Sequence, residues 1–402
     1  MSKQQSRVRL ATAVCLFFCL FSAGCASDSN FDYRLDSIVK PYSFSIMGWE
    51  LENISGGIGQ SSQDSEVGVT GGPEQVEQYF SLVEQIKALE AEIRAITDSG
   101  EEDGLASLEA ELGGLERQKA ALRGVVEAVL AGQIREVLSG QGISKFPPLD
   151  FKLDKPPRLL VVSPRDRIES IREICLHQEL SLEEIEEIEA RVDELGVSSL
   201  VLEIGGLGAT YPSFVADDAS LRFTVDTVAE EWLHQYLVFR PLGFRYLLDL
   251  TGISRDYEIA TMNETVASMV SKEIGAIVYE KYYFQDETGG DSQPPAGPEF
   301  DFNREMREIR RAVDRYLVRG EVEEAEEFME LKREYLVSEG YRIRKLNQAY
   351  FAFHGTYADS PTSVSPIGLE MKELRSRRAS LKDFLDVAAG MTCRQDLIAS
   401  LE

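Results

Sequence analysis

Basic residues are too few in this chain for a partner with a phosphate backbone. Its 42 lysines and arginines stand against 69 aspartates and glutamates, which gives a formal net charge of −27. A surface of this sign repels nucleic acid. Long apolar runs are also missing after residue 25, since no later stretch approaches the roughly 18 apolar residues that a membrane helix needs. We therefore exclude nucleic-acid binding and expect no membrane span in the rest of the chain.

Cysteine is scarce as well, with five residues in the chain. Cys15 and Cys19 fall within the first 25 residues, and Cys25 ends that segment. Only Cys175 and Cys393 remain for the folded body. In an oxidising compartment these two could pair, although single cysteines on helical stretches are more often buried free thiols. The sequence leaves both outcomes open.

Residues 1–25 have the pattern of a targeting segment. A basic start precedes an apolar core, Leu10 to Phe21, that is too short to span a membrane comfortably. The small residues Ser22 to Gly24 then lead to Cys25. This pattern resembles a bacterial lipoprotein signal, which implies a mature chain that starts at a Cys25 modified with diacylglycerol and palmitate. The protein would then be tethered to a membrane on the extracytoplasmic side of the bacterial envelope. An ordinary secretory signal or an uncleaved anchor is the alternative.

The composition is that of a globular protein, with 43% hydrophobic and 9% aromatic residues. Helical periodicity dominates and strand-like runs are short, so we expect an α+β fold that is mostly α-helical. The expected segments are a signal peptide (1–25), short docked helices and a flexible loop (26–74), a helical arm (75–145), a central domain (146–285), a linker (286–300) and a C-terminal helical region (301–402).

The arm is predicted from two long stretches with apolar residues three and four positions apart, 75–96 and 105–138. The turn between them, 97–104, is rich in glycine and acidic residues. The pair indicates an antiparallel helical hairpin with coiled-coil character. A structural spacer is favoured over a partner-binding role, because nothing in the hairpin specifies a partner.

The first half of the central domain mixes strands and helices. We expect strands at 158–163 and 199–204, helices at 168–178 and 182–195, and a short hairpin or edge strand from 213–215 and 221–224. Between them, 205–212 is a glycine-rich turn. It lacks the Lys-Ser/Thr pair of a P-loop and the spacing of a dinucleotide fold, so we reject a phosphate site there.

Candidate chemistry follows in the stretch Val225 to His234. Glu230 and His234 are four residues apart and share one helix face, so both can reach one metal ion. Glu231 points slightly aside, as a general base beside a metal-bound water should. Glu264 opens a later helical run and could supply a third ligand. Asn263 is predicted to cap that run, which puts Glu264 in its first turn. The competing interpretation is a solvated glutamate pair and a partly buried histidine on an amphipathic helix, with Glu264 stabilised by the helix dipole whether or not a metal is bound.

The two motifs, EExxH at Glu230 and NExxA at Asn263, resemble those of the gluzincin (thermolysin-like) zinc peptidases, in which an HExxH helix is completed by a glutamate from an NExxA/S helix. The resemblance covers residues 195–285 and implies a zincin-like domain. It further implies zinc held by Glu230, His234 and Glu264, with Glu231 as general base. Glu230 stands where the family has histidine. The added carboxylate makes the ion a weaker Lewis acid and would also suit manganese or iron.

The C-terminal region is predicted as further helices at 302–319, 321–339, 342–353, 369–377 and 381–389, after a loop at 284–298. Its aromatic stretch 346–359 resembles the Asn-Asn-Ala-containing stretch near the end of predicted bacterial aminopeptidase-like proteins. The resemblance implies that Tyr357, or else Tyr350 or His354, stabilises an oxyanion. Simple core packing is the competing role for each.

Together these patterns lead to two functional hypotheses. The first is a membrane-tethered, extracytoplasmic, metal-dependent peptidase that acts on a peptide or protein substrate. The alternative is a catalytically inactive lipoprotein that keeps the peptidase fold, with or without a metal, and serves as a binding or structural protein of the envelope.

Overall fold

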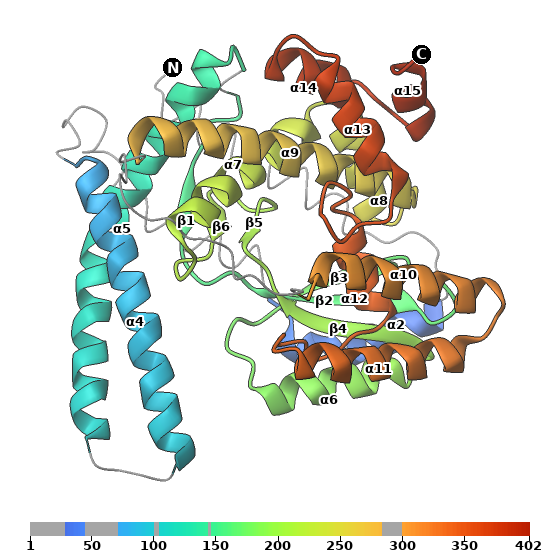
Figure 1. The fold of residues 1–402 in the computed structure, drawn as a ribbon, viewed down its shortest axis with the longest axis horizontal. Coiled ribbons are helices and arrows are strands. Elements are labelled where there is room, and N and C mark those ends of the chain that lie inside the picture. Colours follow the sequence, from blue (N-terminus) through green and yellow to red (C-terminus); the bar gives the residue numbers. More distant parts are fainter. Residues whose placement is uncertain (1–28, 45–70, 100–103, 144–145, 284–299) are drawn as a thin grey trace.

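A computed structural model describes residues 29–44, 71–99, 104–143, 146–283 and 300–402 of the chain. The expected signal peptide with Cys25, most of the loop before the arm and the linker at 286–299 lie outside the described residues. Within them the fold is α+β and mostly helical, as expected, with two small sheets (Figure 1). Cys175 and Cys393 are both free thiols.

The arm consists of α4 (Pro73–Ser99) and α5 (Leu105–Gly140), which lie side by side and antiparallel, as predicted (Figure 1). The C-terminal half of α5 belongs to the body of the protein. Its buried Val126, Leu130 and Ile134 join the main hydrophobic core together with residues of α7 and α9. The hairpin is therefore anchored at one end by apolar packing.

The larger sheet is antiparallel, with the order β3-β2-β4: β2 is Arg158–Pro164, β3 is Arg172–Leu176 and β4 is Val197–Glu203. One face packs on α2 (Ser29–Val39) and α6 (Leu182–Asp193), and the other packs on α12 (Gln348–Gly355). The 3-10 helix η1 (Lys40–Tyr42) follows α2.

The predicted strands in β2 and β4 are confirmed, whereas the helix predicted over 168–178 is wrong because this segment contains β3. Its isoleucines recur at a spacing that fits a helix. Their branched side chains instead favour the pleated surface that pairing with β2 provides.

The smaller sheet has the order β1-β6-β5, formed by β1 (Phe151–Leu153), β6 (Ser213–Val215) and β5 (Gly206–Leu207). The short strand at 213–215 is confirmed as β6. The strand predicted at 221–224 is wrong, because these residues form the first turn of α7 (Leu221–Val238). The Ser220 side chain accepts a hydrogen bond from the Phe223 N–H and caps the helix there.

Three helices follow in succession and carry the candidate site. After α7, Pro241 begins a separate helix, α8 (Pro241–Leu250), and α9 runs over Tyr257–Tyr282. The prediction that Asn263 caps this last helix is wrong. Asp256 is the cap, since its carboxylate accepts hydrogen bonds from the N–H groups of Glu258 and Ile259. Asn263 and Glu264 therefore lie inside α9, where α7 packs along it.

The C-terminal helices are α10 (Phe302–Val318), α11 (Val322–Ser338), α12, α13 (Pro366–Ser376), α14 (Leu381–Ala389) and α15 (Arg394–Ala399). The helix predicted at 342–353 begins only at Gln348, because the Asn347 side chain caps it by accepting from the Tyr350 N–H. The short α15 was not predicted. Throughout the described ranges, each helix is too short or too polar to cross a membrane.

Candidate metal centre

Helix α7 presents two polar faces toward two different parts of the fold. Residues four positions apart lie on one face of a helix. Glu230 and His234 accordingly face α9, where His234 meets the side chain of Asn263. Glu231 and Gln235 face the glycine-rich segment around β5, and the Gln235 amide donates to the Thr210 carbonyl at 2.7 Å. The ligand candidates and the candidate base thus leave the same helix in different directions.

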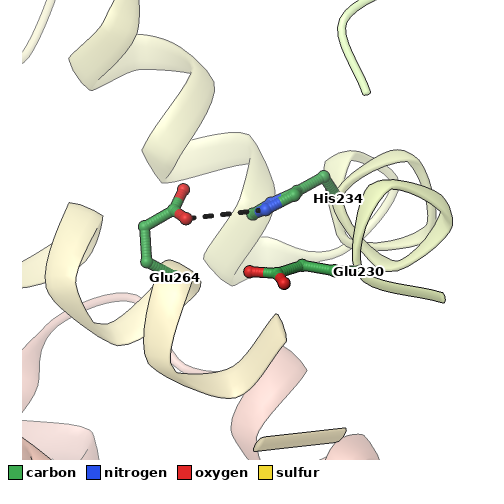
Figure 2. Close-up of side chains that lie close together, drawn as sticks. All are labelled: Glu230, His234 and Glu264. Atoms are coloured by element: carbon green, nitrogen blue, oxygen red, sulfur yellow. Dashed lines mark ion pairs between the residues drawn. The ribbon is translucent and has the colours of Figure 1, made fainter. Parts of the chain in front are cut away.

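The three predicted ligands are brought together. One side-chain ligand atom from each of Glu230, His234 and Glu264 lies within 4.8 Å of the others. Figure 2 shows the first two side chains leaving α7 and the third reaching toward them from α9. His234 Nε2 is 3.6 Å from Glu264 Oε2. Because Glu264 lies beyond the first turn of α9, stabilisation by the helix dipole does not account for its position.

The cluster has the electrostatics of a cation site. The side chains of His234 and Glu264 are 19% and 9% exposed. Burial, reinforced by the charge of Glu264, raises the pKa of Glu230 to about 8. The Oε1 atom of Glu230 is buried and makes no hydrogen bond to any described residue. Gathering carboxylates in this way is unfavourable unless a proton or a cation neutralises part of their charge.

A divalent metal ion fits this donor set. Ligands about 2.1 Å from a tetrahedral ion lie about 3.4 Å apart, so atoms within 4.8 Å of one another need to approach by at most about 1.4 Å to bind one ion. One imidazole with two carboxylates is a set used by zinc and, being rich in oxygen, also suits manganese or iron. The geometry therefore supports a metal site without selecting the metal.

Asn263 orients the imidazole of His234. Its side-chain amide lies 3.1 Å from His234 Nδ1, and its Oδ1 atom is otherwise buried without a hydrogen-bond partner. The amide can turn about its last bond so that Oδ1 faces the ring, because its two ends have nearly the same shape. Oδ1 would then accept a hydrogen bond from Nδ1–H, and Nε2 would keep its lone pair for a metal.

Two tyrosines surround Glu264. Tyr246, from α8, donates a hydrogen bond from its hydroxyl to Glu264 Oε1 at 2.7 Å. Tyr357, which follows α12, also interacts with Glu264. Burial, together with the charges of Glu264, Glu230 and Glu231, raises the pKa of Tyr357. Tyr357 thus lies beside the cluster, while its role in catalysis stays a prediction. Sequence reasoning missed Tyr246, which stands in an ordinary amphipathic helix with no motif to single it out.

The carboxylate of Glu231 rests against the backbone of the glycine-rich segment. The Gly208 N–H donates to it, and a Cβ atom at Gly208 would lie 2.9 Å from Glu231 Oε2. A Cβ at Gly206 would likewise approach the Glu231 Cγ to 2.7 Å. Burial, then the charges of Glu230 and Glu264, raise the pKa of Glu231. The glycines predicted as a simple turn therefore make room for the candidate base, and the raised pKa favours its taking up a proton.

The other two aromatic candidates lie elsewhere. The rings of Tyr350 and His354 are in contact, with centroids 4.3 Å apart and planes tilted by 47°. Both line a cavity of about 270 Å³ that also contacts Tyr257 and Thr261 of α9 but none of the three ligands. This cavity does not connect either residue with the three ligands, and their role at an oxyanion stays a prediction.

Comparison of this chain with known protein families, with curated protein sequences and with solved structures finds no match.

Proposed function

We propose that this protein is a metal-dependent peptidase whose central domain is zincin-like. The observation that carries the proposal is the convergence of Glu230, His234 and Glu264. Glu231 directly follows Glu230 in the same helix, α7. These are the ligands and the base that the gluzincin resemblance implies. The convergence required two helices to pack in one particular register, which chance occurrence of the motifs would not produce.

Each residue has a defined task in the proposed reaction. A divalent ion held by Glu230, His234 and Glu264 would supply Lewis-acid polarisation of the scissile carbonyl. Glu231 would accept a proton from the attacking water and pass it to the leaving amine. The N–H of Gly208 holds the Glu231 carboxylate in place. The hydroxyl of Tyr357 would donate a hydrogen bond to the oxygen that gains negative charge.

The glycine-rich segment offers a place for a peptide backbone. Among the described strands, β5 pairs only with β6, so no described strand occupies its other edge. An extended peptide added at this edge would be bound through main-chain hydrogen bonds, which tolerate many sequences. Because Glu231 packs against Gly206 and Gly208, such a peptide would pass beside the candidate base.

Zinc is our first choice of metal, with manganese or iron as alternatives that the oxygen-rich ligand set permits. Elemental analysis of the purified, metal-replete protein is expected to find about one equivalent of a transition metal. His234→Ala and Glu264→Ala should each lose it. His177→Ala is the matched control, because His177 is exposed and lies outside the cluster. A metal-free wild type, or retention of metal by both cluster variants, would refute the site.

Hydrolysis is tested separately from binding. Glu231→Gln should keep the metal and lower the turnover of an unstructured peptide by about 100- to 10,000-fold, the usual contribution of a general base. If wild type binds metal but cleaves no member of a broad peptide library, the protein is an inactive relative of such enzymes. It would then act by binding.

We further propose that the protein is attached to a membrane of the bacterial envelope through Cys25. The support is the leader sequence alone, since these residues lie outside the described part of the chain. Cys25→Ser is expected to release the protein from the membrane fraction. Unchanged membrane association of this variant would contradict lipidation.

A further inference from the structure

The segment that carries Tyr357 makes a tight turn at that residue. The Ala358 N–H donates to the Thr356 carbonyl at 3.0 Å, so the chain turns over three residues with Tyr357 in the middle. Both neighbours are buried, since Thr356 is 8% and Ala358 is 5% exposed. The position of Tyr357 beside Glu264 therefore depends on what holds the two ends of this turn.

One hydroxyl of α9 binds both ends. Thr265 Oγ1 donates to the Thr356 carbonyl at 3.3 Å and accepts from the Ala358 N–H at 3.1 Å. A hydroxyl can make both bonds at once, because it carries one donor and two acceptor positions. Thr265 directly follows the candidate ligand Glu264 in α9. Two adjacent residues of one helix therefore supply a metal ligand and fix the turn that carries Tyr357.

Further contacts hold the chain just after the turn. Asp359 accepts from Ser268 Oγ at 3.1 Å and from Lys272 Nζ at 2.6 Å, and both donors belong to α9. On α13, a Cβ atom at Gly368 would collide with the Ala358 carbonyl, so only a glycine lets this helix approach so closely. The turn is thus held by contacts with two helices, α9 and α13, in the protein without a ligand.

This anchoring decides how much the Tyr357 hydroxyl can contribute. In the proposed reaction the hydroxyl donates to the oxygen that gains negative charge. A donor of this kind is most effective when it already lies in place and need not move during the reaction. A misplacement of about 1 Å can lower a rate about a hundredfold. Thr265 therefore matters for turnover, although it is fully buried and cannot touch a substrate itself.

We propose that Thr265 is a positioning residue that holds the hydroxyl of Tyr357 in place for the oxyanion. This inference rests on the proposed function, because it concerns the task of Tyr357 at the same metal site. It adds that removal of the Thr265 hydroxyl acts through Tyr357 and leaves the metal bound.

A phosphinic peptide tests the inference without hydrolysis. This compound cannot be cleaved, and its phosphinate oxygens resemble those of the tetrahedral intermediate. Its binding to the zinc-loaded protein is measured by isothermal titration calorimetry. Thr265→Val keeps the shape of the side chain and removes the hydroxyl, so we expect about tenfold weaker binding. Tyr357→Phe should weaken binding at least as much, and Thr265→Ser, which keeps the hydroxyl, should bind nearly as wild type does.

A double-mutant cycle separates positioning from a general structural effect. In the Tyr357→Phe background, Thr265→Val should cause no further loss, because both substitutions remove the same hydrogen bond to the phosphinate. The zinc content should be the same in every variant. Thr261→Val is the matched control, because this buried hydroxyl lies one turn earlier in α9 and donates to the Tyr257 carbonyl of its own helix. It should leave binding unchanged.

Additive losses, unchanged binding by Thr265→Val, or a zinc-loaded wild type that does not bind the phosphinic peptide would each overturn the inference. Should Thr265→Val fail to fold, Ser268→Ala takes its place in the cycle, because it removes one contact of Asp359. A smaller loss that again depends on Tyr357 is then expected, and no such loss would overturn the inference. A wild type that binds the phosphinic peptide but cleaves no peptide counts against the proposed hydrolysis alone, so the two failures are distinguishable.

Discussion

Removing one hydroxyl next to the ligand cluster should weaken metal binding. In Tyr246→Phe, the Glu264 carboxylate, whose side chain is 9% exposed, loses a hydrogen bond of 2.7 Å at its Oε1 atom. A hydrogen bond to a buried charged group contributes about 1.5–3 kcal/mol, which corresponds to about 10- to 150-fold in Kd. Loss of a group that supports a metal ligand usually costs about 10- to 100-fold in affinity. Because Tyr357 also interacts with Glu264, we expect the lower end, about tenfold.

The assay is competition for zinc against a chromophoric chelator at fixed pH. The matched control is Tyr282→Phe, which removes another tyrosine-carboxylate hydrogen bond, from Tyr282 to Glu136, at the far end of α9. The control should bind zinc as wild type does. Equal zinc affinity for Tyr246→Phe and wild type would show that this hydroxyl does not hold Glu264 in a ligating position, and the reasoning about the cluster would fail with it.

Three further outcomes follow from the contacts around the site. Gly206→Ala should lower kcat/KM at least tenfold while the metal is retained, because the new methyl group displaces the Glu231 side chain. The control is Gly132→Ala, because a Cβ atom at Gly132 has no neighbouring atom within 4 Å. Asn263→Ala should weaken zinc binding about tenfold in the chelator assay, whereas Asn263→Asp, which can still accept from His234 Nδ1–H, should not. Denaturation of the metal-free protein should show a pH-dependent stability difference between wild type and Glu173→Gln. The raised pKa of Glu173 means that the native state holds its proton more tightly, so wild type should lose stability relative to the variant as pH rises from about 4.5 through about 7. A flat difference would contradict the raised pKa of Glu173.

The site could be predicted from sequence to the extent that it depends on helical spacing. Glu230 and His234 share a face because they are four residues apart, and Glu264 lies in a second amphipathic run of suitable length. Tyr246, Gln235 and the glycines at 206 and 208 could not be predicted. Their contacts join segments that are distant in sequence, and each is ordinary in its own local context.

The errors in the fold have a common physical origin. The residues of β3 and the first turn of α7 each fit two kinds of local structure, and partners elsewhere in the chain decide between them. Pairing with β2 makes 172–176 a strand, and the cap at Ser220 begins a helix at Leu221. Asn263 resembled a cap for a similar reason, but Asp256 caps α9 about two helical turns earlier.

One polar face of α7 meets α9 and the other meets the glycine-rich segment. Cation binding and proton transfer, which are often lost together, would therefore be separable in the proposed site. In the proposed site, cation affinity would depend on the side that meets α9, and proton transfer would depend on the side that meets the glycines before α7. Substitutions on the glycine side could therefore end turnover and leave an intact ion-binding protein. If the protein is the proposed peptidase, substitutions along one side of a single helix would suffice to turn it into a non-hydrolytic cation-binding protein, so metal content and hydrolysis need separate measurements.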